Sequence, residues 1–304
     1  MEIKRDLLLK RLIDLRHNGM IKVVTGMRRC GKSYLLFNLF TDALKAKGVD
    51  EENIVQINLE DRRNKSLRDP DKLLAYIDSR LKDNKMYYIL LDEVQLVNEF
   101  EDVLNSYLQV KNADVYVTGS NARFLSKDVI TEFRGRGLEI RVHPLSFSEI
   151  RGARPDEPIE QLWIEYITYG GLPQVITMNS DQEKVDYLKG LFKHTYLKDI
   201  KERYDIKLDG DLEELISTLA STVGGLTNPR KLADTFRTVK KSTISQDTIK
   251  VYIDYLQDAF IIERALRYDI KGKRYIDTPS KYYFEDLGLR NALLNFRQVE
   301  KTHL

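Results

Sequence analysis

Residues 26–33, GMRRCGKS, carry glycines, a lysine and a serine at a spacing that suits phosphate binding. They fit the pattern G-x-x-x-x-G-K-[ST] in full, in which the glycines let backbone N–H groups turn toward phosphate oxygens. Lys32 should reach the β- and γ-phosphates, and the Ser33 hydroxyl should bind magnesium. We therefore predict a site for ATP and Mg²⁺, with the nucleotide contacted by Gly26, Met27, Arg28, Arg29, Cys30, Gly31, Lys32, Ser33 and Tyr34.

Two carboxylates, Asp92 and Glu93, follow the apolar run MYYILL at 86–91. An aspartate at such a strand end can hold Mg²⁺, and the glutamate beside it can act as general base toward an attacking water. A plain surface turn is the competing interpretation of two adjacent acids. Small-molecule kinases rarely need the glutamate, because the hydroxyl of their substrate is the nucleophile. The pair therefore favours hydrolysis.

Polar residues near two later strands are candidates for contact with the γ-phosphate. Ser120 or Asn121, after the run DVYVTG, is expected to sense it, although a hydrogen-bonded turn is an alternative. Arg136, with Arg134 two residues before it, precedes the run LEIRVH. An arginine there can stabilise transition-state charge on a nucleotide bound by a neighbouring subunit. The catalytic candidates are Glu93, Lys32, Arg136, Ser120 and Asn121, with Ser33 and Asp92 as metal ligands.

Two weaker hypotheses concern single side chains. Asn58, which ends the run IVQINL, could hydrogen-bond to Glu93 and keep it inactive until a partner binds; a plain strand-end asparagine is equally consistent with the pattern. Cys30 lies beside the start of a helix, a position that can lower a thiol pKa, and could act as a redox brake on ATP binding.

Strand and helix patterns alternate over the first half of the chain. Short apolar runs at 21–25, 54–59, 86–91, 114–119 and 138–143 are separated by amphipathic helical segments. This order predicts an α/β fold, a parallel sheet covered on both faces, with ligands at the carboxyl edge of the strands. The segment before Gly19 reads as an amphipathic helix that packs on this domain, with a peripheral membrane helix as the alternative.

Taken together, these motifs resemble the AAA+ ATPases, and more narrowly a group of bacterial and archaeal AAA-type ATPases with an uncharacterised C-terminal domain. The resemblance implies that Lys32 and Ser33 bind nucleotide and magnesium, that Asp92 and Glu93 form the Walker B pair, and that Arg136 is the arginine finger. Such proteins usually continue into a restriction-endonuclease-like segment, so we expect this chain to be a shortened form. The likeness runs through TGMRRCGKSYLL, ILLDEVQ, VTGSNARFLS, FRGRGLEIRVHPLSFSE, YGGLP, YLKDI and STISQDTIKVYIDYLQDAFII.

The second half is predominantly helical in pattern. Three helical segments followed by two strand-like runs predict a winged-helix arrangement, whose third helix can enter a major groove. Residues 226–281 contain twelve Lys and Arg against seven Asp and Glu, which favours phosphate contacts, although winged helices also bind proteins. The expected organisation is a P-loop domain at 1–150, a helical lid or linker that includes YGGLP at 151–206, a winged-helix-like domain at 207–286, and the start of a further segment at 287–304.

Composition adds mainly exclusions. A net charge of +2 indicates no partner by itself, and the four histidines have no partners at zinc-ligand spacing. One cysteine, no secretory signal and no apolar run long enough to span a bilayer predict a cytoplasmic protein without membrane association.

These observations predict an Mg-dependent ATPase that acts as a molecular switch or motor. It would couple ATP to the engagement of DNA or a protein, and the arginine finger implies a homo-oligomer. The alternative is a nucleotide-binding scaffold with little hydrolysis. Glu93 and the large second domain disfavour a small-molecule phosphotransferase.

Overall fold

The protein divides into two compact units, Met1–His143 and Pro144–Leu304. The computed structural model describes residues 3–119, 133, 135–206, 209–266 and 279–296, with only the backbone of Asp209 and Lys240. The division comes a few residues before the expected boundary at 150, because the chain leaves the sheet after Arg141 and the helix that follows belongs to the second unit.

The first unit contains a five-stranded parallel sheet in the order β2-β3-β4-β1-β5. Every residue of β1 and β3 is buried, as expected for strands covered on both faces. Because β4 lies between β1 and β3, the carboxyl ends of these three strands are neighbours. The sheet predicted from the sequence is confirmed, with strands β1 Ile21–Thr25, β2 Ile54–Asn58, β3 Tyr87–Asp92, β4 Ala113–Thr118 and β5 Gly137–Arg141.

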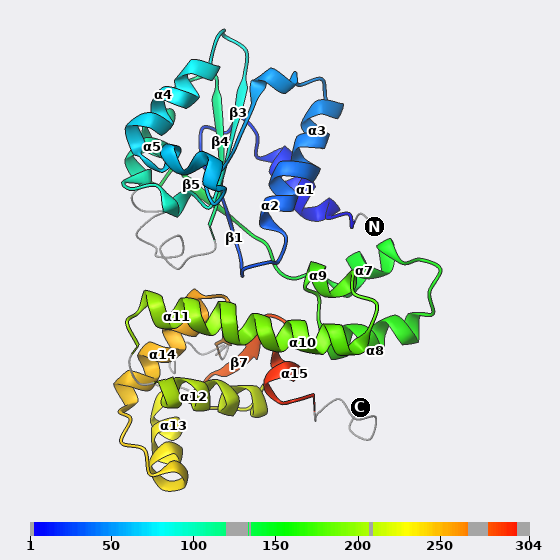
Figure 1. The fold of residues 1–304 in the computed structure, drawn as a ribbon, viewed down its shortest axis with the longest axis vertical. Helices are drawn as coiled ribbons and strands as arrows, with labels where there is room; N and C mark the ends of the chain where they lie inside the picture. The colour runs from blue at the N-terminus through cyan, green and yellow to red at the C-terminus, as the bar shows by residue number, and fades with distance from the viewer. Residues whose placement is uncertain (1–2, 120–132, 134, 207–208, 267–278, 297–304) are drawn as a thin grey trace, which may run out of the picture. The chain divides into compact units, whose positions relative to one another are not determined.

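Helices cover both faces of this sheet (Figure 1). Helices α4 and α5 pack on one face over a core that includes Val23, Ile89 and Val117. The other face is covered by α1 and by a continuous helix made of α2, η1 and α3. Leu12 of α1 is fully buried and α1 packs against η1, as expected of an amphipathic helix that packs on the domain. The helical segments are α1 Asp6–Asp14, α2 Lys32–Tyr34, η1 Leu35–Phe40, α3 Thr41–Ala46, η2 Glu51–Asn53, η3 Arg62–Arg68, α4 Pro70–Arg80, η4 Val94–Leu96 and α5 Phe100–Tyr107.

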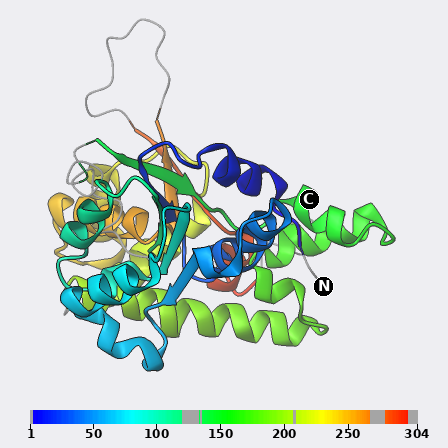
Figure 2. The same cartoon turned by 90° about the horizontal axis from the view of Figure 1, so that it is seen from above.

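The second unit is mainly helical. Segments α10, η6 and α11 follow one another without a break and form one long helical rod (Figures 1 and 2). Two helix starts in this unit are capped by side chains: Asn228 accepts the N–H of Lys231, and Ser245 accepts that of Thr248. Its elements are α7 Phe147–Ala153, α8 Ile159–Tyr169, α9 Pro173–Ile176, α10 Asp181–Leu191, η6 Phe192–Leu197, α11 Lys198–Arg203, α12 Asp209–Ser221, α13 Pro229–Thr235, η7 Phe236–Lys240, α14 Gln246–Asp258, β6 Ile262–Ala265, β7 Lys281–Phe284 and α15 Leu287–Leu293.

The glycine pair of YGGLP docks on the N-terminus of α15. A carboxylate oxygen of the buried Asp286 accepts the N–H of Gly171 at 2.8 Å, and the other accepts that of Leu289 at 2.9 Å. A Cβ at Gly170 would lie 2.4 Å from that carboxylate, so the turn requires a residue without a side chain. Asn291 donates to the carbonyls of the α8 C-terminus. Residues 287–293, expected to begin a further segment, are therefore an integral part of this unit.

Strands β6 and β7 pair antiparallel, and one further bridge extends this small sheet. Thr227, between α12 and α13, and Ser280, directly before β7, exchange two backbone hydrogen bonds at 3.0 and 2.9 Å. The order along the chain is therefore helix, bridge, helix, helix, strand and strand.

Candidate nucleotide-binding and hydrolysis site

The loop between β1 and α2 has the tight backbone that its glycines predict. Gly26 has a φ of 142° and Gly31 a φ of 98°, both in the region that favours glycine. A Cβ at Gly26 would lie 2.1 Å from the carbonyl oxygen of Val142, the residue that follows β5. The loop therefore turns closely against the neighbouring strand, and this approach requires a residue without a side chain at position 26.

The ammonium group of Lys32 is folded back on its own loop. Its Nζ donates to the carbonyl oxygens of Gly26 and Met27, both at 2.9 Å, and the side chain is buried. A lysine that reaches phosphates must exchange these two bonds for phosphate oxygens, which are stronger acceptors because they are charged. These two hydrogen bonds hold the Lys32 ammonium beside the start of the loop, close to the backbone that the motif predicts to contact phosphate.

Two residues of the loop point inward and anchor it. Met27 and Cys30 are buried, and the Cys30 thiol donates to the carbonyl of Val142 at 3.3 Å. Burial raises the pKa of this thiol, with the charges of Lys32 and Arg5 acting in the opposite direction. The expected lowering of the pKa is therefore wrong, because loss of solvation outweighs the effect of the helix start. Cys30 holds the loop with its backbone and core packing, whereas Arg28 is half-buried and Arg29 and Tyr34 are exposed.

A buried arginine outside the motif supports the same loop. Arg5, just before α1, donates to the carbonyl of Cys30 at 3.1 Å and to that of His143 at 2.9 Å. It ties the phosphate-binding loop to the chain that leaves β5. Sequence reasoning missed it, since its partners are far away along the chain and the segment MEIKRD has no motif.

Asp92, at the end of β3, is the centre of a short hydrogen-bonded chain. Its Oδ1 accepts the Ser33 hydroxyl at 2.9 Å and the Thr118 hydroxyl at 2.5 Å. Burial raises the pKa of Asp92, while these two hydrogen bonds lower it. The strand order explains why these three side chains are close together. Thr118 ends β4, and β4 lies between β1, which leads into the loop, and β3, which ends at Asp92. The structure thus brings together Ser33 and Asp92, as predicted for a magnesium site.

Glu93 is fixed at its backbone and at its side chain. Its φ of 56° is unusual for a residue with a side chain, and such strain concentrates at functional sites. Its N–H donates to the Thr118 hydroxyl at 3.0 Å, and its carbonyl accepts the N–H of Leu96. The amide of Gln95 donates to its carboxylate.

Asn58 does not take the role that we considered for it. Its amide oxygen accepts the N–H groups of Glu60 and Asp61, at 2.8 and 3.2 Å. The side chain therefore closes the turn after β2, and Gln95 is the amide that holds Glu93.

Arg136 lies at the opposite edge of the sheet from the phosphate-binding loop. Its carbonyl accepts the N–H of Ile21, the first residue of β1, at 2.8 Å, whereas the loop follows the last residue, Thr25. Its side chain is exposed. The arginine is thus absent from the cluster around Asp92. Ser120, Asn121 and Arg134 lie outside the described residues.

Comparison with known proteins gives the family. Residues 18–151 match an AAA domain family, and residues 160–300 match a domain of unknown function, DUF8612. The chain is 36% identical over 293 residues to an uncharacterized protein of Haemophilus influenzae, covering 95% of this chain and 72% of the relative. The chain belongs to the AAA+ ATPases that carry this C-terminal domain.

A second sequence relative and a solved structure are also similar to this AAA+ ATPase. It is 28% identical over 289 residues to an uncharacterized protein of Methanocaldococcus jannaschii, covering 91% of this chain and 62% of that one. A solved structure of the Aeropyrum pernix ORC2 protein, with ADPNP and ADP, aligns with a TM-score of 0.51 at 11% identity, covering 96% and 92% of the two chains. This last likeness shows the fold alone.

Within the described ranges, no group of three or more His, Cys, Asp and Glu side chains is arranged to hold a metal ion. In the same part of the chain, no helix is long and apolar enough to cross a membrane.

Proposed function

We propose that this AAA+ ATPase hydrolyses ATP with Mg²⁺ at the site around Asp92. The observation that carries the proposal is the chain of hydrogen bonds from Ser33 through Asp92 and Thr118 to the N–H of Glu93. It connects the phosphate-binding loop with the acid that would act as base. A site that only bound nucleotide would need the loop, and would not need a glutamate beside it that is held at its N–H, its carbonyl and its carboxylate.

The oxygen donors around Asp92 fit magnesium. Mg²⁺ prefers oxygen ligands and is usually held by one or two protein groups plus phosphates and water. Ser33 and Asp92 supply a hydroxyl and a carboxylate 2.9 Å apart, and a nearby cation would offset the burial that raises the pKa of Asp92. When bound, the ion supplies positive charge that offsets the charge of the phosphate groups.

Residues of this chain would bind the phosphates and accept the proton of the attacking water. Lys32 would exchange the loop carbonyls for phosphate oxygens, and backbone N–H groups of the loop would hold the same oxygens. The Glu93 carboxylate would take a proton from the attacking water as its oxygen bonds to the γ-phosphorus. The bridging oxygen would leave with ADP, and the proton would pass from Glu93 to solvent.

The test is phosphate release by the full chain with Mg-ATP, compared with Glu93→Gln and Lys32→Ala. Glu93→Gln should lose hydrolysis and keep nucleotide binding, whereas Lys32→Ala should lose both. If wild type releases no more phosphate than Glu93→Gln although it binds ATP, the protein is a nucleotide-binding scaffold and the hydrolase proposal is wrong.

A second proposal concerns the second unit, which we infer to engage duplex DNA through a winged-helix arrangement. The bridge between Thr227 and Ser280 is the specific observation that favours it. This bridge adds a third short strand position beside β6 and β7 and places it between the first and second helix of the set, as the winged-helix order requires. The unit contains the helices α12, α13 and α14 in that order.

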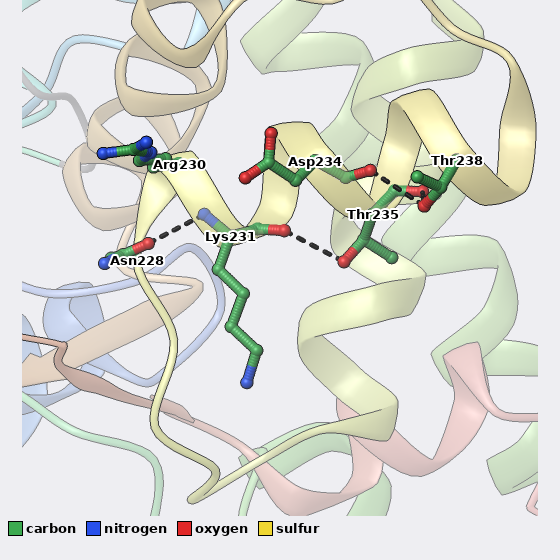
Figure 3. A pocket seen from close by; sticks show the side chains of 6 residues that line it. All are labelled: Asn228, Arg230, Lys231, Asp234, Thr235 and Thr238. Atoms are coloured by element: carbon green, nitrogen blue, oxygen red, sulfur yellow. Dashed lines mark hydrogen bonds between the residues drawn. The ribbon is translucent and has the colours of Figure 1, made fainter.

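The basic surface of this unit lies along α13 and the turn after η7, here called the α13 face. Its exposed cations are Arg230, Lys231, Arg237 and Lys241, and one acid, Asp234, lies among them. A hollow of about 380 Å³ on this face is lined by six residues, whose side chains are drawn in Figure 3: Asn228, Arg230, Lys231, Asp234, Thr235 and Thr238. On α14, the exposed Lys250 lies between the exposed acids Asp247 and Asp254. This helix therefore presents few hydrogen-bond donors for the acceptor atoms on the base edges of DNA.

Phosphate contacts without extensive base reading are therefore expected, and such binding is sensitive to salt. Three further basic residues of 226–281, Lys271, Lys273 and Arg274, lie outside the described residues. The test is duplex binding, and stimulation of ATP hydrolysis by duplex, at two salt concentrations. Arg230→Glu with Lys231→Glu should weaken both, and Lys189→Glu, an exposed lysine of α10, is the control. No binding at either salt concentration would contradict the proposal and favour a protein partner.

A further inference from the structure

The side chain of Gln95 stands directly beside the proposed base and has no role in the motifs that define the site. Gln95 lies in the short turn η4, two residues after Glu93, and its Nε2 donates to Glu93 Oε2. Its own carbonyl oxygen, Oε1, is buried and finds no donor among the described residues. We propose that Gln95 is a positioning residue that holds the Glu93 carboxylate in the orientation needed for hydrolysis. This inference rests on the proposed function.

The direction of the amide follows from its neighbour. A carboxylate accepts hydrogen bonds and cannot donate them when ionised, so the NH₂ group of Gln95 must face it. The reverse orientation would bring two acceptor oxygens together. The consequence is that Oε1 is buried with no donor in the described part of the chain, which is an unfavourable arrangement for a carbonyl group. The contact with Glu93 therefore determines how this amide is placed.

The rest of Glu93 is held independently of Gln95. Thr118 fixes the backbone N–H and Leu96 the carbonyl, and the strained φ of 56° results from this turn. These backbone contacts fix the position of the Glu93 Cα and Cβ atoms. The orientation of the carboxylate depends instead on the groups that contact its oxygens. Asn58 is occupied by the turn after β2, so Gln95 supplies the amide contact for that group.

Oε1 of Gln95 belongs to the same amide group whose nitrogen contacts Glu93, and an amide oxygen accepts a hydrogen bond from a donor that approaches it. A water activated by Glu93 has two protons: one passes to the carboxylate as the water oxygen bonds to the γ-phosphorus, and the second needs an acceptor that orients it. Oε1 supplies that acceptor, and the second proton stays on the phosphate product. A positioned base and a positioned water both raise kcat and leave nucleotide affinity unchanged.

The test compares Gln95→Met, which keeps length and loses both polar atoms, with Gln109→Met, an exposed glutamine after α5. Gln95→Met should lower kcat for ATP on the order of 10- to 100-fold, with KM and ADP affinity changed by less than about twofold. Gln95→Asn, too short to reach the same carboxylate oxygen, should not restore kcat. Gln109→Met should behave as wild type.

A double variant separates positioning from a general loss of structure. If Gln95 acts through Glu93, adding Gln95→Met to Glu93→Gln should cause no further loss of the residual rate. An additive loss, a matching loss of ADP affinity, or an unchanged kcat in Gln95→Met would each overturn the inference while leaving the proposed hydrolysis intact. Absence of hydrolysis in wild type would instead overturn the proposed function, and this inference with it.

Discussion

Arg136 and Lys32 lie at opposite ends of strand β1. The backbone of Arg136 pairs with Ile21 at the start of the strand, and the side chain of Lys32 is bound to the carbonyl of Gly26 just after its end. A strand advances about 3.3 Å per residue, so the two edges are separated by about 13 Å along β1. Since Arg136 is also exposed, its position suits a nucleotide on a neighbouring molecule better than the one in its own loop.

This separation predicts that Arg136 acts between subunits. Arg136→Ala should lower ATP hydrolysis by a factor on the order of 10³, as measured for other arginine fingers, without loss of ATP binding. Mixing it with Lys32→Ala, which cannot bind nucleotide, should restore activity, because each Lys32→Ala subunit still supplies Arg136. In a head-to-tail assembly about a quarter of the sites should recover after random mixing. No recovery in a mixture shown to form joint assemblies would mean that Arg136 does not act in a neighbouring site.

The sequence was sufficient for the sheet and for the residues on its carboxyl edge. Continuous apolar runs such as MYYILL locate buried strands well, and each of the five strands begins and ends within two residues of its predicted run. The phosphate-binding motif fixes its own geometry through Gly26 and Gly31. The approach of Ser33 to Asp92 followed from placing both at one edge of a parallel sheet.

What the sequence could not supply were contacts that depend on strand order and distant packing. Thr118 reaches Asp92 because β4 is inserted between β1 and β3, an order that no local pattern encodes. Arg5 reaches the loop through partners 25 and 138 residues away. The pKa of Cys30 was predicted from its neighbour, the helix start, whereas its burial depends on the whole domain.

The burial of Cys30 predicts an unreactive thiol in the folded protein. Since burial raises its pKa, little thiolate forms near neutral pH, and the side chain is inaccessible. A chromogenic disulfide reagent should modify Cys30 within seconds in urea and at least about 100-fold more slowly in the native state. ATP binding should be the same before and after peroxide, in wild type and in Cys30→Ala. Rapid native modification that blocks ATP binding would restore the redox hypothesis.

Asp286 predicts a pH-dependent stability of the second unit. Burial raises the pKa of this carboxyl to about 6, although three backbone N–H groups favour its charged form. Because the folded pKa is above the ordinary value of 3.8, the stabilisation is complete below about pH 4 and is lost as the pH rises through 6. The full change in the free energy of unfolding that this pKa difference implies is about 3 kcal/mol. The measurement is urea unfolding followed by Trp163, the single tryptophan, at pH 4.5 to 7.5. The difference between wild type and Asp286→Asn should fall with rising pH, and a flat difference would contradict the raised pKa.

Removing one partner of a buried ion pair in the first unit should lower the free energy of unfolding. Lys22 of β1 and Asp114 of β4 form a salt bridge with both side chains buried, and Asp114 also accepts the hydroxyl of Tyr116 at 2.9 Å and the N–H of His17 at 3.1 Å. Burial lowers the pKa of Lys22, and Asp114 opposes that shift. Lys22→Met should lower the free energy of unfolding by about 3–5 kcal/mol, because it leaves a buried carboxylate without its cation.

An exposed ion pair provides the control for this prediction, and a second substitution at Asp114 provides a rescue. Lys85→Met removes an exposed lysine that pairs with Asp50 at 3.0 Å, and it should leave the midpoint of urea unfolding, followed by circular dichroism, unchanged. Adding Asp114→Asn to Lys22→Met should recover part of the lost stability, since a neutral amide removes the unpaired charge and can still accept from Tyr116 or His17. If Lys22→Met unfolds at the same urea concentration as Lys85→Met, the buried pair does not stabilise the sheet as its burial implies.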